Sequence, residues 1–222
     1  MKELPLYLLL VVIGYLLGSI PTGQIVGALA GGVDLRRYGS GKTGATNVLR
    51  TLGWGAALVV VAGDLAKGIV AVLIARWLVP AAGGSTGFLP DPNAQPLAEV
   101  LAGFAAVIGH NWSIFIQLKG GRGVVVSHAV FILICWPAAL ITTVISAIVL
   151  AVSRIVSLAS LTGAAAGVLV LAIFVVLFHY PLPYLVYGVL AAGLIWLRHI
   201  DNIQRLLAGT ERKLGQKAQP LP

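Results

Sequence analysis

Charged residues are scarce in this chain of 222 residues. Asp, Glu, Lys and Arg together make up 10% of it, whereas a soluble domain carries about a quarter. Hydrophobic residues account for 59%. Such a composition leaves too little polar surface for an ordinary soluble protein. It predicts an integral membrane protein in contact with membrane lipids, organised as one domain over 1–222.

Cysteine, histidine and acidic residues are also few. The single Cys135 lies in an apolar run, so no intrachain disulfide is possible, and the four histidines form no cluster with metal-ligand spacing. The sequence therefore predicts no metal site and no cofactor. Seven acidic residues against 15 Lys and Arg give a net charge of +8. We attribute this excess to membrane topology and to anionic substrates or lipid headgroups, not to a nucleic-acid partner.

Long apolar runs are abundant, and they predict an all-α bundle of transmembrane helices. The first run contains Gly18 to Gly23, with Pro21, and is expected to kink or break there. A cleavable signal peptide is not expected, because the start has no net positive charge and the first run is too long. The segment 124–152 is too long for one straight span and short for two. The other expected spans are 4–30, 54–79, 97–118, 158–178 and 184–197.

The positions of the basic residues favour two spans in 124–152, and thus seven in total. With seven spans, 12 of the 15 Lys and Arg lie on one side, and the opposite loop, 80–96, carries only Asp91. The positive-inside rule then predicts an external N-terminus and a cytoplasmic C-terminus, with 210–222 as a flexible basic tail. The twelve are Arg36, Arg37, Lys42, Arg50, Lys119, Arg122, Arg154, Arg198, Arg205, Arg212, Lys213 and Lys217.

A polar, glycine-rich loop from Asp34 to Arg50 joins the first two spans. Its glycines allow positive φ and close approach to a ligand, and successive backbone N–H groups in such a loop can bind an anion. We interpret it as a phosphate-binding loop, since an ordinary cytoplasmic loop would explain only the arginines. The segment GSGKT resembles the end of a Walker A motif, but Arg36 replaces its first glycine, so nucleotide binding is not expected. The candidate ligand residues are Gly39, Ser40, Gly41, Thr43, Gly44, Thr46, Asn47 and Arg50.

Further polar groups are expected on the same side of the membrane. A second basic glycine turn favours anion binding, and a third set shares one helix face beyond the seventh span. Asp64 and Lys67, three residues apart within the second span, are expected to neutralise each other in a structural role. The turn comprises Lys119, Gly120, Gly121, Arg122 and Gly123; the third set is His199, Asn202 and Arg205, with Ser157 and Ser160 nearby.

At these residues the chain resembles the bacterial acyl-phosphate:glycerol-3-phosphate acyltransferases, over nearly its whole length. The resemblance implies an enzyme of the bacterial inner membrane that transfers a fatty acyl group from acyl phosphate to the 1-hydroxyl of glycerol 3-phosphate. The products are lysophosphatidate and phosphate. The segments that carry it are GSIPTG from Gly18, GSGKTGATNV from Gly39, DLAKG from Asp64, GHNW from Gly109, KGGRGV from Lys119, VSLAS from Val156 and RH from Arg198.

The resemblance also implies residue roles. Ser40 and Arg50 match an essential serine and arginine, and His199 and Asn202 match a functional pair. Lys119 to Gly123 match a turn linked to glycerol 3-phosphate binding, and Glu211 matches a residue tied to structural integrity. Lys42 departs from the usual Asn of this family, and either strengthens phosphate binding or removes a neutral contact.

Two alternatives remain open at this point. Asp64, Lys67 and the broken spans also fit a membrane transporter or binding protein for a phosphate-bearing solute. An altered loop also fits a homologue without the family's activity. The sequence gives neither the acyl-chain length nor the oligomeric state.

Overall fold

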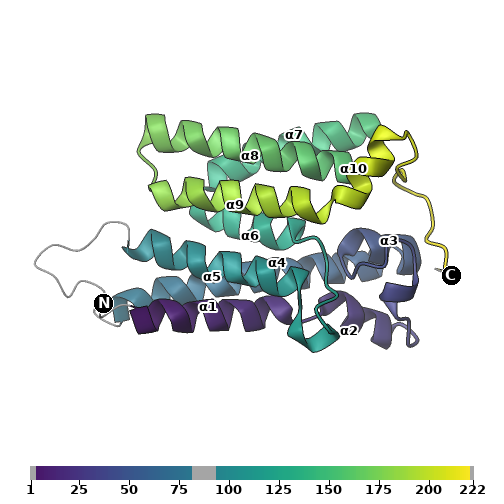
Figure 1. The fold of residues 1–222 in the computed structure, drawn as a ribbon, viewed down its shortest axis with the longest axis horizontal. Coiled ribbons are helices and arrows are strands. Elements are labelled where there is room, and N and C mark those ends of the chain that lie inside the picture. The colour runs from purple at the N-terminus through teal and green to yellow at the C-terminus, as the bar shows by residue number, and fades with distance from the viewer. Residues whose placement is uncertain (1–3, 82–93, 221–222) are drawn as a thin grey trace, which may run out of the picture.

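The computed structural model describes residues 4–81 and 94–220, and this part of the chain is helical, with one isolated bridge between Tyr38 and Pro220 (Figure 1). The expected all-α class is confirmed. Asp91 of the predicted external loop lies outside the described residues. The helices are α1 (Leu4–Ser19), α2 (Thr22–Leu29), α3 (Ala45–Leu52), α4 (Trp54–Ala81), α5 (Ala94–Asn111), α6 (Val124–Ile134), α7 (Trp136–Ser153), α8 (Val156–Phe178), α9 (Leu182–Arg198) and α10 (Ile200–Leu207).

Each of the seven apolar segments expected to span the membrane is helical, but the segments differ in length. Within the described residues, five are long and apolar enough to cross a membrane, and α9 with α10 makes a sixth if the bent pair is one span. The remaining segment, α6, has 11 residues, about 16 Å at the α-helical rise. The count of seven spans therefore stays a prediction.

The first span is broken at Pro21, as its sequence indicates. Proline lacks an N–H and disfavours helix at the preceding residue, so α1 ends at Ser19 and α2 begins at Thr22. Glycines bring α1 close to α5: a Cβ on Gly18 would lie 2.0 Å from the carbonyl oxygen of Ala106. Helices in a membrane associate through such small residues because lipid removes the hydrophobic drive between them.

Two further breaks shape the second half of the chain. The segment 124–152 divides at Cys135, and Pro137 occupies the first turn of α7, where a proline ring fits. The helix expected to leave the membrane carrying His199 does not continue straight from α9, because α10 turns away from α9 by 63°. His199 lies at this bend.

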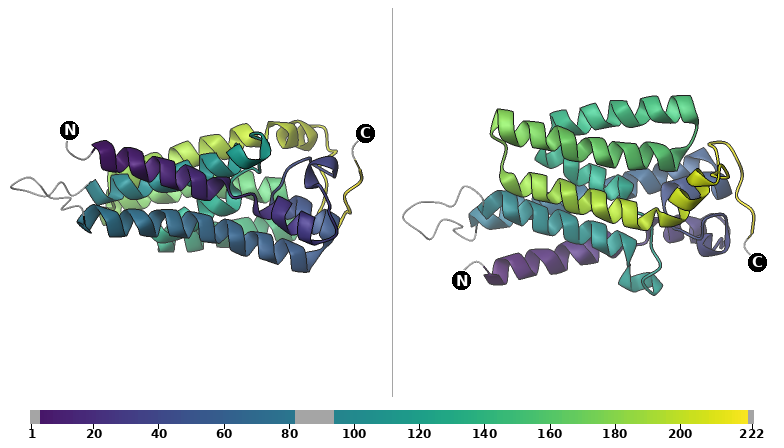
Figure 2. Two further views of the ribbon diagram at one scale, coloured as in Figure 1. Left: turned by 90° about the horizontal axis from the view of Figure 1, so that it is seen from below. Right: turned by 45° about the horizontal axis from the view of Figure 1, so that its top comes forward.

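The basic segments gather at one end of the bundle. The loop with α3, the turn before α6 and the tail after α10 all lie at the end opposite the N-terminus (Figures 1 and 2). The α7–α8 junction lies there as well. Large apolar side chains, such as Leu58, Leu140, Leu169 and Val189, are exposed along the helices, as expected for a lipid-facing surface. The bundle thus holds its basic loops, its glycine turn and its C-terminal tail at one rim.

Candidate active site

A cavity of about 160 Å³ lies at this rim, and we call it the central cavity. The N-termini of three helices reach it: Gly44 to Asn47 of α3, Gly123 to Val125 at α6, and Val156 with Ser157 of α8. None of the three N-cap residues, Gly44, Gly123 and Ile155, makes a side-chain capping hydrogen bond. The first N–H groups of a helix have no intrahelical acceptor and carry partial positive charge, so this convergence favours an anion.

Asn47 organises the first loop. Its Nδ2 lies 3.1 Å from the oxygen of Leu35, 3.0 Å from that of Tyr38 and 2.9 Å from that of Lys42, and its Oδ1 accepts a hydrogen bond from the Ser40 amide. The side chain is therefore used inside the loop, contrary to the expectation that it donates to a ligand. The Asn47 side chain is used in this way because a buried amide needs several hydrogen-bond partners.

The glycines of the loop differ in what they do. Gly39 and Gly41 have φ of 58° and 65°, in the left-handed region expected for them. Gly44 has φ of −78° as the N-cap of α3, so the expected positive φ is wrong at this position. A Cβ on Gly44 would meet nothing within 4 Å, which leaves room for a ligand at the helix N-terminus.

Arg50 joins the loop to the C-terminal segment and keeps one donor for the cavity. Its Nη2 donates to the carbonyl oxygen of Arg212 at 3.2 Å, while its buried Nε has no hydrogen-bond partner. Burial and the nearby charge of Arg212 lower the pKa of Arg50, although an arginine stays protonated. A buried N–H without an acceptor is costly, so an anionic ligand near Nε would satisfy it.

The second glycine turn is packed more tightly than an anion-binding nest requires. The Gly120 amide donates to the oxygen of Asn111, and the Gly121 amide to the oxygen of His110. A Cβ on Gly121 would lie 2.1 Å from Nε2 of His110. These glycines allow the turn to lie against α5, and their amides are already used, which corrects the expectation that they bind the anion. Gly123, at φ 77°, is the N-cap of α6.

Two arginines hold this turn against the bend at His199. Arg122 donates from Nη2 to Asp201 at 2.8 Å and from Nε to the oxygen of Arg198 at 3.1 Å. Arg198 donates back to the oxygens of Gly121 and Asn111, and its guanidinium lies 4.9 Å from the ring centroid of Trp112. Burial lowers the pKa of both arginines. Both side chains connect the turn to α9 and α10.

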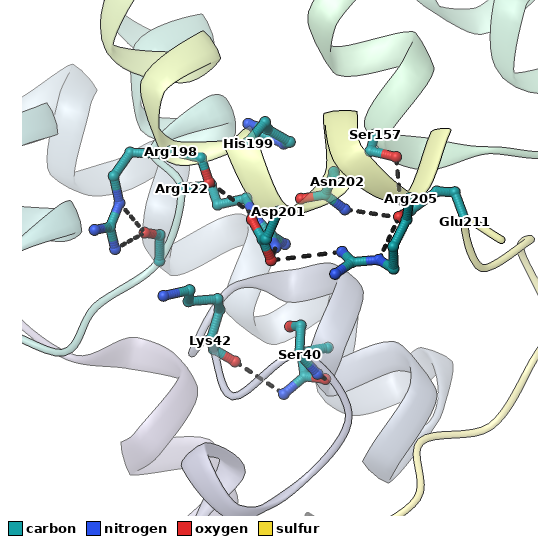
Figure 3. Close-up of polar contacts among 12 residues, drawn as sticks. Ser40, Lys42, Arg122, Ser157, Arg198, His199, Asp201, Asn202, Arg205 and Glu211 are labelled. Atoms are coloured by element: carbon teal, nitrogen blue, oxygen red, sulfur yellow. Dashed lines mark hydrogen bonds and ion pairs between the residues drawn. The ribbon is translucent and has the colours of Figure 1, made fainter. Parts of the chain in front are cut away.

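Glu211 links three segments behind the cavity. One carboxylate oxygen accepts from Ser157 of α8 at 3.1 Å and from Asn202 of α10 at 2.8 Å, and the other accepts from Arg205 at 2.7 Å (Figure 3). The carboxylate is 4% exposed. Asn202 keeps a buried Oδ1 without a partner. Arg205 thus pairs with the Glu211 carboxylate, whereas the Oδ1 of Asn202 can still accept a hydrogen bond from a ligand.

His199 is held in one tautomer by its neighbour. Its Nδ1 lies 2.7 Å from the carbonyl oxygen of Ile195, and because a carbonyl only accepts, Nδ1 carries the proton. The side chain is 3% exposed and lines the central cavity. A neutral imidazole with Nδ1 protonated has Nε2 as its acceptor.

Asp64 and Lys67 form the expected ion pair, at 2.8 Å. Thr22 of α2 donates to the same carboxylate oxygen at 2.5 Å, and His110 Nδ1 lies 3.5 Å from it. The pair thus neutralises itself while joining α4 to α2 and α5. Both charges have partners, which removes the main argument for a transport pathway through the bundle.

Two further cavities adjoin the central one. The apolar cavity, about 360 Å³, is bounded by residues of α4, α6, α7, α8 and α9, including Leu65, Phe131, Gly167 and Ala191. It shares Val124, Val125 and Ser160 with the central cavity. The outer cavity, about 430 Å³, is polar, and its lining residues are Asp34, Arg36, Gly41, Lys42, Gln117, Leu118, Lys119, Gly120 and Arg198.

The central cavity gathers most of the predicted site residues. Lys119, Gly41 and Gly120 line the outer cavity instead. Five predicted residues line neither cavity, namely Gly39, Thr43, Lys67, Gly121 and Arg205. Lys42, which the sequence placed in the loop as either a phosphate contact or the loss of a neutral one, lines this cavity too. His110 and Val156 were not predicted as site residues, and only the polarity of the GHNW segment pointed to His110. The predicted residues at the central cavity are Ser40, Gly44, Thr46, Asn47, Arg50, Asp64, Arg122, Gly123, Ser157, Ser160, His199, Asn202 and Glu211.

The fold and the site define an integral-membrane helical protein with a basic rim beside an apolar cavity. Residues 8–209 match the model of the glycerol-3-phosphate acyltransferase family. The chain belongs to this family.

Related proteins and solved structures agree with this family assignment. The glycerol-3-phosphate acyltransferase of Trichormus variabilis is 44% identical over 210 residues, 93% of this chain and 91% of that protein. Glycerol-3-phosphate acyltransferase 3 of Dehalococcoides mccartyi strain 195 is 43% identical over 96% of this chain and 97% of that protein. The crystal structure of PlsY (YgiH), an integral membrane glycerol 3-phosphate acyltransferase, in its glycerol 3-phosphate form, has a TM-score of 0.79 at 35% identity, covering 94% of this chain and 96% of that one. Its lysophosphatidic acid form gives 0.77 at 34%.

Proposed function

We propose that this protein transfers a fatty acyl group from acyl phosphate to the 1-hydroxyl of glycerol 3-phosphate, in the first step of phospholipid synthesis. The observation that carries the proposal is the convergence of three uncapped helix N-termini on a cavity that adjoins an apolar one. Acyl phosphate combines the two chemistries in one molecule, an anionic head and an apolar chain. The names of the relatives support glycerol 3-phosphate as the acceptor.

The donor's phosphate fits the N-terminus of α3. There it meets backbone N–H groups, the Thr46 hydroxyl, the Ser40 hydroxyl and the unpaired Nε of Arg50. Its acyl chain extends past Val124 and Val125 into the apolar cavity. Arginine suits this position because its N–H groups match phosphate oxygens in pairs.

The reaction needs a hydroxyl, a polarised carbonyl and a good leaving group. The acceptor oxygen bonds to the carbonyl carbon, the bond from that carbon to the phosphate oxygen breaks, and the hydroxyl proton passes to Nε2 of His199 or to the departing phosphate. Donors aimed at the carbonyl oxygen stabilise its developing charge. Because the donor is already activated, we propose direct transfer without an acyl-enzyme. Asn202, through its unpaired Oδ1, orients the acceptor hydroxyl.

The proposed setting is the bacterial inner membrane, with the site at the cytoplasmic surface. Seven spans, an external N-terminus and a cytoplasmic C-terminus put the four basic segments on one side, in line with the positive-inside rule. Their common position at one end of the bundle supports this orientation (Figure 1).

Purified protein mixed with palmitoyl phosphate and glycerol 3-phosphate should release phosphate only when both are present, with lysophosphatidate as the second product. Arg50→Ala should lose at least about a hundredfold of this activity, since it removes donors from the developing charge. Arg37→Ala is the matched control, because Arg37 is 83% exposed in the same loop. Transport of glycerol 3-phosphate into proteoliposomes without conversion, or no turnover from well-folded protein, would refute the proposal.

A further inference from the structure

Lys42 occupies a position between two cavities. Among the residues lining the described cavities, it is the one shared by the central and the outer cavity. Its backbone carbonyl is held by Asn47 Nδ2 at 2.9 Å, which fixes where the side chain starts. In Figure 3 the ammonium extends away from Ser40, toward the side where the Arg198 side chain lies. The side chain thus stands where a solute would pass from one cavity to the other.

The ammonium of Lys42 has no hydrogen bond or ion pair with the part of the chain that the structure describes. The two nearby guanidiniums are different, because Arg122 is bound to Asp201 and Arg198 to the oxygens of Gly121 and Asn111. Lysine is a flexible point charge with three donors, so it can follow a ligand that the fixed arginines cannot.

The charges around Lys42 do not balance. Lys42, Arg122 and Arg198 contribute three positive charges, against which Asp201 acts on all three and Glu211 acts on Arg122. Burial, and then the charges of Arg198 and Arg122, lower the pKa of Lys42, against the opposite effect of Asp201. Like charges this close repel, and an anion between them removes the repulsion.

We propose that Lys42 binds the phosphate monoester of the soluble substrate, glycerol 3-phosphate, at the passage between the outer and central cavities. The proposal rests on the proposed function and adds to it a phosphate ligand that belongs to this chain's own GSGKT loop.

The order of the cavities selects the soluble substrate over the acyl donor. The apolar cavity meets the central one at Val124, Val125 and Ser160, whereas the outer cavity meets it at Lys42. The outer cavity also carries the exposed Lys119 and the half-buried Arg36, which is paired with Asp34. An acyl chain therefore belongs at one end of the central cavity, and a small polar phosphate ester at the other.

The test compares Lys42→Gln with Arg37→Gln, which removes the same charge from the exposed part of the same loop. Glycerol 3-phosphate binding is measured by calorimetry without acyl donor, and KM is measured for each substrate separately. Lys42→Gln should weaken glycerol 3-phosphate binding and raise its KM about tenfold, the worth of one charge-assisted hydrogen bond. Its KM for palmitoyl phosphate and its kcat should stay within about twofold. Lys42→Arg should restore most of the affinity.

Other results overturn the inference. An unchanged affinity for glycerol 3-phosphate in Lys42→Gln, or a rise in KM confined to palmitoyl phosphate, places Lys42 elsewhere. An equal loss of glycerol 3-phosphate affinity in Arg37→Gln would show that Lys42 acts only through the general positive charge of the loop. Thermal unfolding in detergent distinguishes variants that fail to fold from folded variants that have lost affinity. Because binding is measured without turnover, wild-type protein that binds glycerol 3-phosphate through Lys42 but makes no lysophosphatidate would refute the proposed function alone.

Discussion

At the scale of single residues, Asn47 illustrates how one side chain sets a loop. Its amide accounts for the positions of three carbonyl groups and one N–H. We expect Asn47→Ala to lower the free energy of unfolding by about 1–3 kcal/mol, the cost of leaving buried polar groups unpaired, and to reduce activity strongly. Thermal unfolding and phosphate release measure the two effects. Thr51→Ala, one turn further along α3, is the control, and an equal effect there would contradict this role.

The charge state of Lys42 gives a prediction about pH. Burial and the neighbouring arginines lower its pKa, so the side chain loses its proton at a lower pH than an ordinary lysine. The protonated form binds phosphate, hence affinity is present below this pKa and falls as the pH rises through it. We expect the KM for glycerol 3-phosphate to rise in the alkaline range for the wild type and to stay low to higher pH in Lys42→Arg. Parallel pH profiles of the two proteins would argue against Lys42 as the phosphate ligand.

At the scale of elements, the second glycine turn is positioned by contact with α5. A Cβ at Gly121 would overlap the ring of His110, which itself lies near Asp64. We expect Gly121→Ala to lower thermal stability and raise the KM for glycerol 3-phosphate, because Arg122 and Lys119 shift with the turn. Gly193→Ala in α9 should leave both unchanged or slightly improve stability, since nothing lies within 4 Å of its Cβ position and alanine favours helix.

The elements also show how far a sequence can be interpreted. Hydrophobic runs and prolines located the helices and the break at Pro21, because both depend on residues close in the chain. The helical break within 124–152 was likewise predicted, from the positions of the basic residues, and Pro137 lies beside it. The bend at His199 and the use of the Gly120 and Gly121 amides depend on distant partners. Local spacing does not reveal which carbonyl group a given N–H will meet. The sequence therefore predicted a group of residues of which most line one cavity, but it did not predict which of their N–H groups are used in packing contacts.

At the scale of the whole molecule, the C-terminal segment, expected to be a flexible tail, contacts the first loop. The Ala218 amide donates to the oxygen of Arg50, and the Gly39 amide to the oxygen of Gln219. We expect deletion from Lys217 onward to speed hydrogen exchange at Gly39 and to lower kcat severalfold, with helix content unchanged. Unchanged exchange at Gly39 after deletion would show that the loop keeps its shape without the tail.

The three cavities lie in sequence, polar, central and apolar, and this order has a consequence for the products. With the proposed function, the acceptor arrives from water and leaves as a lipid, while the phosphate leaves in the opposite direction. The two products then part into different solvents, so neither accumulates at the site to reverse the reaction. The protein would act as a phase-transfer catalyst, in which the membrane boundary itself helps to drive turnover.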